Sequence, residues 1–370
     1  MKKLLTFLVF ALLNTFAISQ TTIIDSIKSG GIYRNYRVYI PAAYTGISAR
    51  PMVFDLHGYT SSASAEQAYS NFKPIADTAN FIVVYPNGTL LNGQPYWNAG
   101  FGAGVNDIEF ISNLIDTLSN QYNIDISSIY SCGMSNGGYM SHTLACALNN
   151  RIAAIASVTG TMATSQRATC VPNRAVPVMQ ISGTNDPTVT YTGMSGSLAI
   201  DTVVKYWVTN NNCNTTPVFN NVPNISSADA CTAEHYVYNG GTYGSCVELY
   251  KIIGGAHTWP GSPFTIAVTN QDFNASEKIW LFFRKYKLSQ FTGFNELNNE
   301  MDFNIFPNPS SDILTIKGGE IFTVFIIDVN GTVVLETTKK QIDISHLAKG
   351  VYSLIFIVDK KRSVKKMVKL

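Results

Sequence analysis

Charged residues are scarce in this chain. Asp, Glu, Lys and Arg make up 14% of its 370 residues, against about 25% in an average soluble protein, and the formal net charge is only +2. A net charge this small gives the protein only a weak positive field, which would bind a phosphate backbone poorly. The first 290 residues also contain no basic stripe interleaved with aromatic residues. Nucleic acid is therefore not an expected partner.

Motifs for cofactors and metals are also missing. The sequence has no Walker loop, no dinucleotide-binding glycine fingerprint and no His-Glu-x-x-His motif, and none of its six cysteines forms a Cys-x-x-Cys pair. We therefore expect no cofactor and no metal. The cysteines allow many disulfide pairings, among which the sequence does not choose. Cys132 lies in an apolar run, where a buried free thiol is at least as compatible with the pattern as a bridge.

Long apolar runs are absent except at the amino terminus. Two lysines precede an apolar run from Leu4 to about Ile18, which ends in small residues. The run is shorter than the roughly 20 residues of a membrane-spanning helix, and Asn14 interrupts it. We expect residues 1–19 to be a cleaved signal peptide, the chain to be exported, and the mature protein to have no transmembrane segment.

Short β-branched runs alternate with amphipathic helical runs from residue 22 to residue 288. Strands are expected at residues 33–40, 52–56, 81–85, 129–132, 152–158, 176–181 and 247–253. Helices are expected at residues 64–79, with a restart at Pro74, and at 106–119, 136–148, 201–209 and from Asn274 onward. This alternation predicts an α/β domain over residues 20–288, with a mostly parallel sheet covered by helices on both faces.

The chain changes character after this domain. Residues 289–302 are polar and aperiodic, as in a linker. Residues 303–370 contain β-branched runs at 313–316, 322–327, 332–335 and 352–358, separated by turn signals such as Asn330-Gly331. The pattern predicts a small all-β sandwich, and it contains no candidate for catalysis.

This last domain resembles the C-terminal sorting domain of the type IX secretion system of Bacteroidetes. That domain typically opens with Asn-x-x-Pro-Asn-Pro, matched by residues 304–309, and continues with Asp-x-Ser-x-Leu-x-x-Gly-x-Tyr, matched by residues 343–352. It ends in a basic tail, as this chain does. The resemblance implies that the type IX machinery is a partner and that the mature protein is secreted or held at the cell surface.

The residues around Ser135 indicate nucleophilic catalysis. The strand expected at 129–132 leads into the Gly-x-Ser-x-Gly sequence of residues 133–137, and a helix is expected directly after it. Glycines at these positions permit a sharp turn that leaves the serine exposed at a helix N-terminus, where negative charge is favoured. A glycine-rich turn with a capping serine is the alternative, but the strand before and the helix after favour a nucleophile elbow.

A nucleophilic serine needs a base, and in this arrangement an acid and then a histidine follow it in the chain. His257 follows the strand expected at 247–253 and is the expected general base. The other four histidines precede the serine or lie within an expected helix, a β-rich run or the last domain, namely His57, His142, His235 and His346. Asp186, after the strand at 176–181, is expected to orient the base. Asp201 is the alternative acid, although its position suits a helix cap better.

An oxyanion hole completes this set. One donor is expected from the backbone N–H of Asn136, and the other from the N–H of Tyr59, which follows His57-Gly58 at the end of the strand 52–56.

The same residues carry a resemblance to a known group. The segments at 57–58, 85–88, 96–98, 105–107, 133–138, 183–186 and 254–261 are similar to those of secreted polyhydroxybutyrate depolymerases, feruloyl esterases and acetylxylan esterases, including carbohydrate esterase family 1. The resemblance covers about residues 34–286. It implies an α/β-hydrolase fold and a secreted serine esterase that works through an acyl-enzyme.

Two departures from the group bear on the substrate. Depolymerases of this group often have a cysteine where this chain has Tyr59, and they commonly add a polymer-binding domain. We therefore expect feruloyl or acetyl esters on plant cell-wall polysaccharide as substrates, with feruloyl esters preferred. Tyr59, Tyr96, Trp97 and Trp259 could form an aromatic wall for a phenolic acyl group, or pack in the core. The alternatives are a short-chain polyester depolymerase and a non-catalytic carbohydrate-binding protein, against which the complete Ser, Asp and His set argues.

Overall fold

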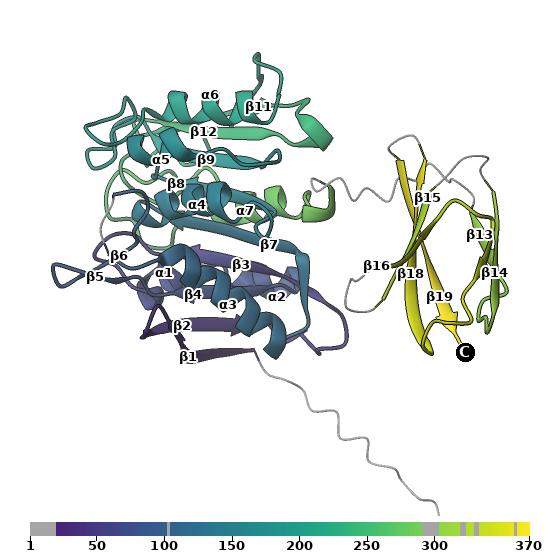
Figure 1. The fold of residues 1–370 in the computed structure, drawn as a ribbon. Helices are drawn as coiled ribbons and strands as arrows, with labels where there is room; N and C mark the ends of the chain where they lie inside the picture. Colours follow the sequence, from purple (N-terminus) through teal and green to yellow (C-terminus); the bar gives the residue numbers. More distant parts are fainter. Residues whose placement is uncertain (1–19, 102–103, 291–302, 319–322, 329–332, 359–360) are drawn as a thin grey trace, which may run out of the picture. The chain divides into compact units, whose positions relative to one another are not determined.

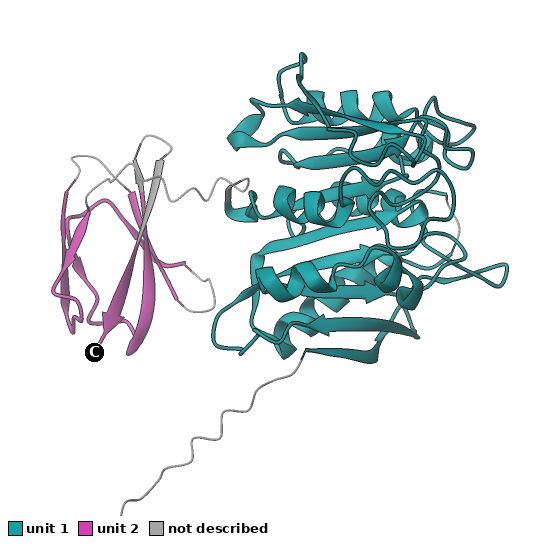
Figure 2. Cartoon of the chain, turned by 180° about the vertical axis from the view of Figure 1, so that it is seen from behind, with its two compact units in different colours: residues 1–292 teal, residues 293–370 magenta. Residues whose placement is uncertain are grey.

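The structure is a computed structural model that describes residues 20–101, 104–290, 303–318, 323–328, 333–358 and 361–370. The chain forms two compact units, Met1–Thr292 and Gly293–Leu370 (Figure 2). The expected signal peptide and residues 291–302 of the expected linker lie outside the described residues. Among the described residues, no helix has the length and apolar character needed to cross a membrane.

A ten-stranded sheet forms the centre of the first unit (Figure 1). Its strand order is β1-β2-β4-β3-β7-β8-β9-β12-β11-β10. The six central strands are parallel, and antiparallel strands close both sides. The strands are β1 (Thr21–Ser29), β2 (Ile32–Ile40), β3 (Arg50–Leu56), β4 (Ile82–Pro86), β7 (Ile124–Met134), β8 (Ala154–Val158), β9 (Val178–Gly183), β10 (Val218–Asn221), β11 (Thr232–Tyr238) and β12 (Val247–Ile253).

Helices cover both faces of this sheet. One face packs against α3 (Asp107–Gln121), α4 (Asn136–Ala147) and α6 (Ile200–Asn210). The other packs against α1 (Ala63–Tyr69), α2 (Lys73–Ala79) and α7 (Ala275–Phe283). Alternation along β3 shows why two cores form, because Phe54 points into the first cluster and its neighbour Val53 into the second. The expected α/β-hydrolase fold is confirmed.

Smaller elements connect this framework. They are the hairpin of β5 (Thr89–Leu91) and β6 (Gln94–Tyr96), helix α5 (Thr164–Thr169), and the 3-10 helices η1 (Thr242–Gly244) and η2 (Leu288–Gln290). A disulfide joins Cys146, at the end of α4, to Cys170, directly after α5. Cys132 is a buried free thiol, which was one of the two options that the sequence left open.

The individual elements confirm some expectations and correct others. The helical run at 64–79 divides into α1 and α2, and Pro74 lies in the first turn of α2, which confirms the expected restart of the helix at this proline. Asp201 is not a helix cap, because Ala199 is the N-cap of α6 and Asp201 lies in the first turn. Strands β1, β10 and β11 were not among the expected strands. All four residues of β10 are exposed, so this edge strand lacks the apolar alternation by which strands are recognised.

The second unit contains two antiparallel sheets that share one core. One sheet has the order β13-β14-β17 and the other β16-β15-β18-β19. The strands are β13 (Asn304–Phe306), β14 (Ile313–Lys317), β15 (Thr323–Ile327), β16 (Val333–Thr337), β17 (Gln341–Asp343), β18 (Gly350–Val358) and β19 (Lys361–Lys369). Leu314 of the first sheet and Val324 and Phe356 of the second meet in this core. The all-β sandwich is confirmed, and the basic tail at the end of the chain is its last strand.

Candidate active site

Ser135 stands on a strained turn between β7 and α4. Its backbone has φ 53° and ψ −119°, a left-handed conformation that costs energy in a residue with a side chain. Its N–H donates a hydrogen bond to the carbonyl of Val158 (2.8 Å), which fixes the turn to the neighbouring strand β8. A Cβ atom on Gly133 or Gly137 would collide with the carbonyl of Leu56 on β3. The two glycines of the motif are therefore required by the close passage of β3.

Asp186 and His257 form a direct pair. Nδ1 of His257 donates to Oδ2 of Asp186 at 2.7 Å, and the carboxylate is almost completely buried. The other carboxylate oxygen accepts the backbone N–H groups of Thr188 (2.8 Å) and Val189 (2.9 Å). These contacts fix the direction of the carboxylate. With Nδ1 protonated, Nε2 is the ring nitrogen that can accept a proton.

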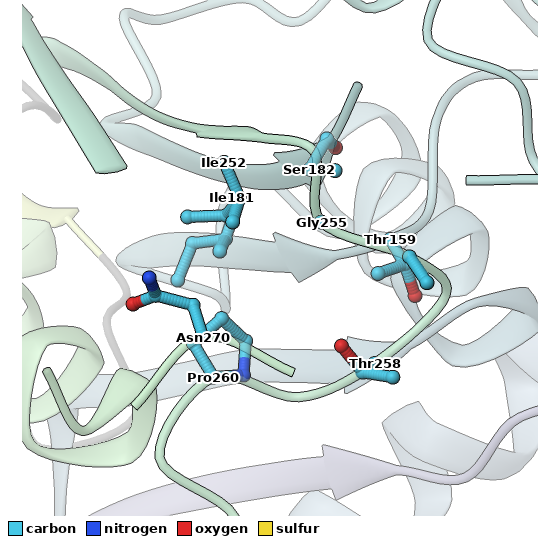
Figure 3. Close-up of a pocket in the computed structure, with 10 residues that line it drawn as sticks. Thr159, Ile181, Ser182, Ile252, Gly255, Thr258, Pro260 and Asn270 are labelled. Atoms are coloured by element: carbon cyan, nitrogen blue, oxygen red, sulfur yellow. The ribbon is translucent and has the colours of Figure 1, made fainter. Parts of the chain in front are cut away.

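Hydrogen bonds hold the two loops that carry this pair together. The N–H of Asn185 donates to the carbonyl of Gly255 (3.0 Å), and the N–H of Gly254 donates to Oγ1 of Thr184 (2.8 Å). Figure 3 shows a small pocket at these loops, lined by residues that include Gly255, Ile181 and Ile252. None of its lining residues is ionisable, so this pocket supplies no acid or base.

All three expected triad residues lie at the same edge of the sheet. Ser135 follows β7, Asp186 follows β9 and His257 follows β12, and these strands are parallel. No hydrogen bond between Ser135 and His257 is present among the described residues, and such contacts often tighten only when substrate binds. Asp201, the alternative acid, instead accepts the hydroxyl of Tyr191 (2.8 Å).

The loop after β3 lies against Ser135. A Cβ atom on Gly58 would lie 3.5 Å from the Cβ atom of Ser135, an ordinary van der Waals contact, so the loop passes directly beside the elbow. Hydrogen bonds of the His57 side chain stabilise this loop. Its Nδ1 donates to the carbonyl of Gly58 (2.7 Å), and its Nε2 accepts the N–H of Gly88 (2.9 Å). Burial lowers the pKa of His57 to about 4, so the ring is neutral near pH 7 and structural.

Asn136 joins the elbow to a second loop. It opens α4, so its N–H has no partner inside the helix and is free for an oxyanion. Its buried carboxamide forms two hydrogen bonds with the backbone of Trp97. Oδ1 accepts the N–H of Trp97 (2.6 Å), and Nδ2 donates to its carbonyl (3.0 Å). The indole N–H of Trp97 donates in turn to the carbonyl of His57 (3.0 Å). Trp97 thereby connects the elbow, which carries Asn136, to the loop after β3, which carries His57 and Tyr59.

A buried ion pair extends this connection away from the site. Asp107 accepts the N–H of Asn98 (2.7 Å) and pairs with the guanidinium of Arg34 (2.6 Å). Sequence reasoning missed the Asn136 contacts and this ion pair. The segments at 96–98 and 105–107 did carry a signal, because they were among those that matched the esterase group.

Three of the four aromatic residues considered for an acyl-binding wall pack in the core, which was the other option that the sequence left open. Trp97 and Trp259 are completely buried, and Tyr96 is buried as well. The indole N–H of Trp259 donates to Oγ of Ser276 (3.0 Å), and its ring packs edge-on against Phe72. Large rings with satisfied polar atoms inside the core offer no surface to an acyl group. Tyr59 is the exception, with 47% of its surface exposed.

The other histidines of the first unit have structural partners. His142 is buried between Oε1 of Gln180 (3.1 Å) and the indole N–H of Trp207 (3.1 Å), and burial lowers its pKa to about 4. His235 contacts Glu248 at 2.9 Å. Within the described ranges, no group of three or more His, Cys, Asp or Glu side chains is placed to hold a metal ion.

Comparisons with known proteins agree with this geometry. Residues 103–225, which include Ser135 and Asp186, match the phospholipase/carboxylesterase family. A bifunctional acetylxylan esterase/xylanase of Neocallimastix patriciarum is 30% identical over 48% of this chain and 25% of its own length. Feruloyl esterase B of Piromyces equi is 30% identical over 43% of this chain and 30% of its own length. The chain therefore spans less than a third of these relatives.

A solved structure shares the fold. An acetyl xylan esterase from Aspergillus awamori superposes with a TM-score of 0.51 and 15% identity, over 64% of this chain and 94% of that one. Residues 304–370 match the secretion system C-terminal sorting domain family, which confirms the expectation for the second unit. The chain therefore has an α/β-hydrolase fold with a region that matches the phospholipase/carboxylesterase family, followed by a region that matches the secretion system C-terminal sorting domain family.

Proposed function

We propose that this protein is an exported serine esterase that hydrolyses carboxylic esters through an acyl-enzyme on Ser135. The observation that carries the proposal is the Asp186–His257 pair at 2.7 Å, at the sheet edge where Ser135 stands on its strained turn. A buried carboxylate that fixes the tautomer of a histidine beside a serine elbow is the arrangement that activates a hydroxyl group.

The proposed reaction has two steps, formation of an acyl-enzyme and its hydrolysis. Oγ of Ser135 attacks the ester carbonyl carbon while Nε2 of His257 takes the hydroxyl proton, and the N–H groups of Tyr59 and Asn136 stabilise the resulting oxyanion. The carbon–oxygen bond to the alcohol then breaks, and the alcohol leaves with the proton from His257. Water repeats the sequence on the acyl-enzyme, which releases the acid and restores Ser135. Asp186 stabilises the imidazolium in both steps without becoming protonated.

Acetyl or feruloyl esters on plant cell-wall polysaccharide are the proposed substrates. The names of the two curated relatives, an acetylxylan esterase/xylanase and a feruloyl esterase, support this choice. The sorting domain supports export, which would bring the enzyme to polymers that cannot enter a cell.

Substitution of the proposed triad tests this function. On nitrophenyl acetate, methyl ferulate and acetylated xylan, Ser135→Ala and His257→Ala should each lower kcat by about a millionfold, because a triad acts as a unit. Asp186→Asn should lower kcat by about ten-thousandfold, because it favours the wrong tautomer of the histidine. Asp201→Asn is the matched control, since Asp201 contacts Tyr191 and not His257.

Three results would contradict the proposal. Activity of Ser135→Ala within about tenfold of the wild type would remove the nucleophile assignment. A larger loss in Asp201→Asn than in Asp186→Asn would show that the acid is misassigned. Binding of xylan without hydrolysis of any ester would identify a non-catalytic carbohydrate-binding protein instead.

A further inference from the structure

A cavity of about 250 Å³ is lined by residues of α6, the loop after it and the end of β11, and by no residue of the proposed triad. Val204 of α6 and Tyr238 of β11 supply apolar surface. The polar lining residues are Asp201, Lys205, Thr209 and Thr215. The cavity is smaller than the roughly 300 to 1,000 Å³ of pockets that enclose a drug-sized ligand, so it suits one unit of a longer ligand.

Hydrogen bonds fix the elements around this cavity. The N–H of Asn214 donates to the carbonyl of Asn239, the residue after β11, at 2.7 Å. The neighbouring Thr215 is thereby held at the end of this strand. Asp201 accepts the hydroxyl of Tyr191 (2.8 Å), which attaches the first turn of α6 to the segment before that helix. The cavity is therefore a fixed feature of the first unit.

Two more aromatic rings continue from Tyr238 along the same face of the sheet. Tyr236 lies two residues before Tyr238, so both side chains point to one face of β11, where both pack against the core that α6 covers. Phe219 of β10 pairs with Tyr236 across the strands, and their ring centroids lie 5.2 Å apart. The ring of Phe219 is 52% exposed, and those of the two tyrosines are half-buried. We call Tyr238, Tyr236 and Phe219 the aromatic row.

The cavity and the aromatic row suit an uncharged sugar chain. One face of a sugar ring carries C–H groups that pack on an aromatic ring, and its hydroxyl groups both donate and accept hydrogen bonds. The hydroxyls of Thr209 and Thr215 can do both, the ammonium of Lys205 donates and the carboxylate of Asp201 accepts. Asp201 and Lys205 lie one turn apart on α6 and carry opposite charges, so the cavity has little net charge to attract an ion.

We propose that the cavity and the aromatic row form a second binding site, which holds an uncharged polysaccharide chain while the proposed triad acts on an ester attached to that chain. The inference rests on the proposed function for the polymer that carries the ester, although binding of sugar at this site requires no ester. Tyr191, the partner of Asp201, lies in the segment that follows Asp186, so the cavity adjoins the loop of the proposed acid. A chain held there keeps its esters at a high local concentration near the triad, an advantage that a small ester does not gain.

Binding of xylohexaose, which carries no ester, tests this site separately from catalysis. Isothermal titration calorimetry gives the Kd of the wild type and of each variant. Tyr238→Ala and Phe219→Ala should each raise the Kd by up to about tenfold, the size of one aromatic contact. Tyr238→Phe keeps the ring and should raise the Kd less. Tyr33→Ala is the matched control and should leave it unchanged, since Tyr33 is an exposed tyrosine (74%) on β2, at the other side of the sheet.

Hydrolysis shows whether the second site serves the reaction. In Tyr238→Ala and Phe219→Ala, kcat/KM on acetylated xylan should fall by the factor by which the Kd rises, and kcat/KM on nitrophenyl acetate should stay as in the wild type. The change on xylan should lie in KM. Asp201→Asn therefore remains a control for kcat.

Four outcomes would contradict these expectations. A wild-type protein that does not bind xylohexaose, or an unchanged Kd in Tyr238→Ala, would overturn the inference and leave the esterase proposal intact. An equal loss of kcat/KM on xylan and on nitrophenyl acetate would also overturn it. If Phe219→Ala separated a dimer in sedimentation experiments without changing the Kd, the aromatic row would be an interface between two copies of the chain. A wild-type protein that binds xylohexaose and hydrolyses neither ester would overturn the proposed function instead.

Discussion

Glu66 is a buried carboxyl group outside the proposed triad. It lies in α1, and Oε1 has no hydrogen-bond partner among the described residues. Burial first, and then the nearby Asp55, raise the pKa of Glu66 well above its ordinary value. Asp55 is also buried and accepts the hydroxyl of Ser70 (2.6 Å), and burial raises its pKa to about 7. Near neutral pH, the folded protein therefore retains protons on these carboxyl groups that the unfolded chain has released.

This raised pKa predicts that stability falls as pH increases. A group with a raised pKa in the folded state stabilises the fold fully below its unfolded pKa, and that stability is lost as pH rises through the folded pKa. Glu66→Gln keeps the side chain neutral at every pH. The free energy of unfolding of this variant should fall less steeply between about pH 5 and about pH 8, by up to about 1.4 kcal/mol per pH unit.

Urea unfolding at several pH values measures this slope. Glu277→Gln is the control, because Glu277 is an exposed carboxylate in the first turn of α7. It should leave the slope as in the wild type. Equal slopes for Glu66→Gln and the wild type would show that Glu66 is ionised in the folded protein.

The elements around the proposed site are held together by side chains that act on backbone. Asn136 and Asn211 make the same two-point contact, the first with Trp97 and the second with Val176. Val176 precedes β9 and so lies at the opposite end of that strand from the loop that carries Asp186. The two asparagines therefore form a natural pair for separating stability from catalysis.

Asn136→Ala should lower both stability and turnover, and Asn211→Ala only stability. Asn136→Ala removes the partner of the N–H of Trp97, whose carbonyl still accepts the N–H of Ala99 (3.0 Å), and Asn211→Ala removes the partners of the N–H and the carbonyl of Val176. A buried backbone group left without a partner costs about 1 to 3 kcal/mol. In Asn136→Ala the backbone donor of the proposed oxyanion hole remains, but the loop around Trp97 loses its contact with residue 136. We therefore expect kcat to fall about tenfold or more while KM changes less. Urea unfolding and ester hydrolysis measure the two effects. Equal kcat values in both variants would show that the Asn136 contact serves folding alone.

The sequence predicts some elements of this molecule better than others. The central strands were predictable because each is an apolar run, and the elbow because its glycines and flanking elements form a local pattern. Edge strand β10 was not predictable, since its residues are exposed and lack alternation. The burial of Trp97 was not predictable either. An aromatic residue in a loop looks the same in sequence whether a carboxamide such as that of Asn136 covers it or solvent does.

At the scale of the whole molecule, the two units have separate cores. Trp280 and Phe283 of α7 belong to the core of the first unit, whereas Phe303 belongs to that of the second. Every residue of the proposed site lies in the first unit, and the second matches a sorting domain. Catalysis and export should therefore be separable by cutting between the units.

A chain from Gln20 to Thr292 should fold and keep its kcat on a soluble ester within about twofold of the longer chain, because the cut removes no residue of the first core. Differential scanning calorimetry and nitrophenyl acetate hydrolysis measure the two properties.

In a host with the matching secretion system, the same truncation should leave active enzyme inside the cell envelope, since it removes the sorting domain. The full-length Ser135→Ala variant is the control, and it should be exported although inactive. If the truncated enzyme lost activity on acetylated xylan alone, the second unit would be a polysaccharide-binding module.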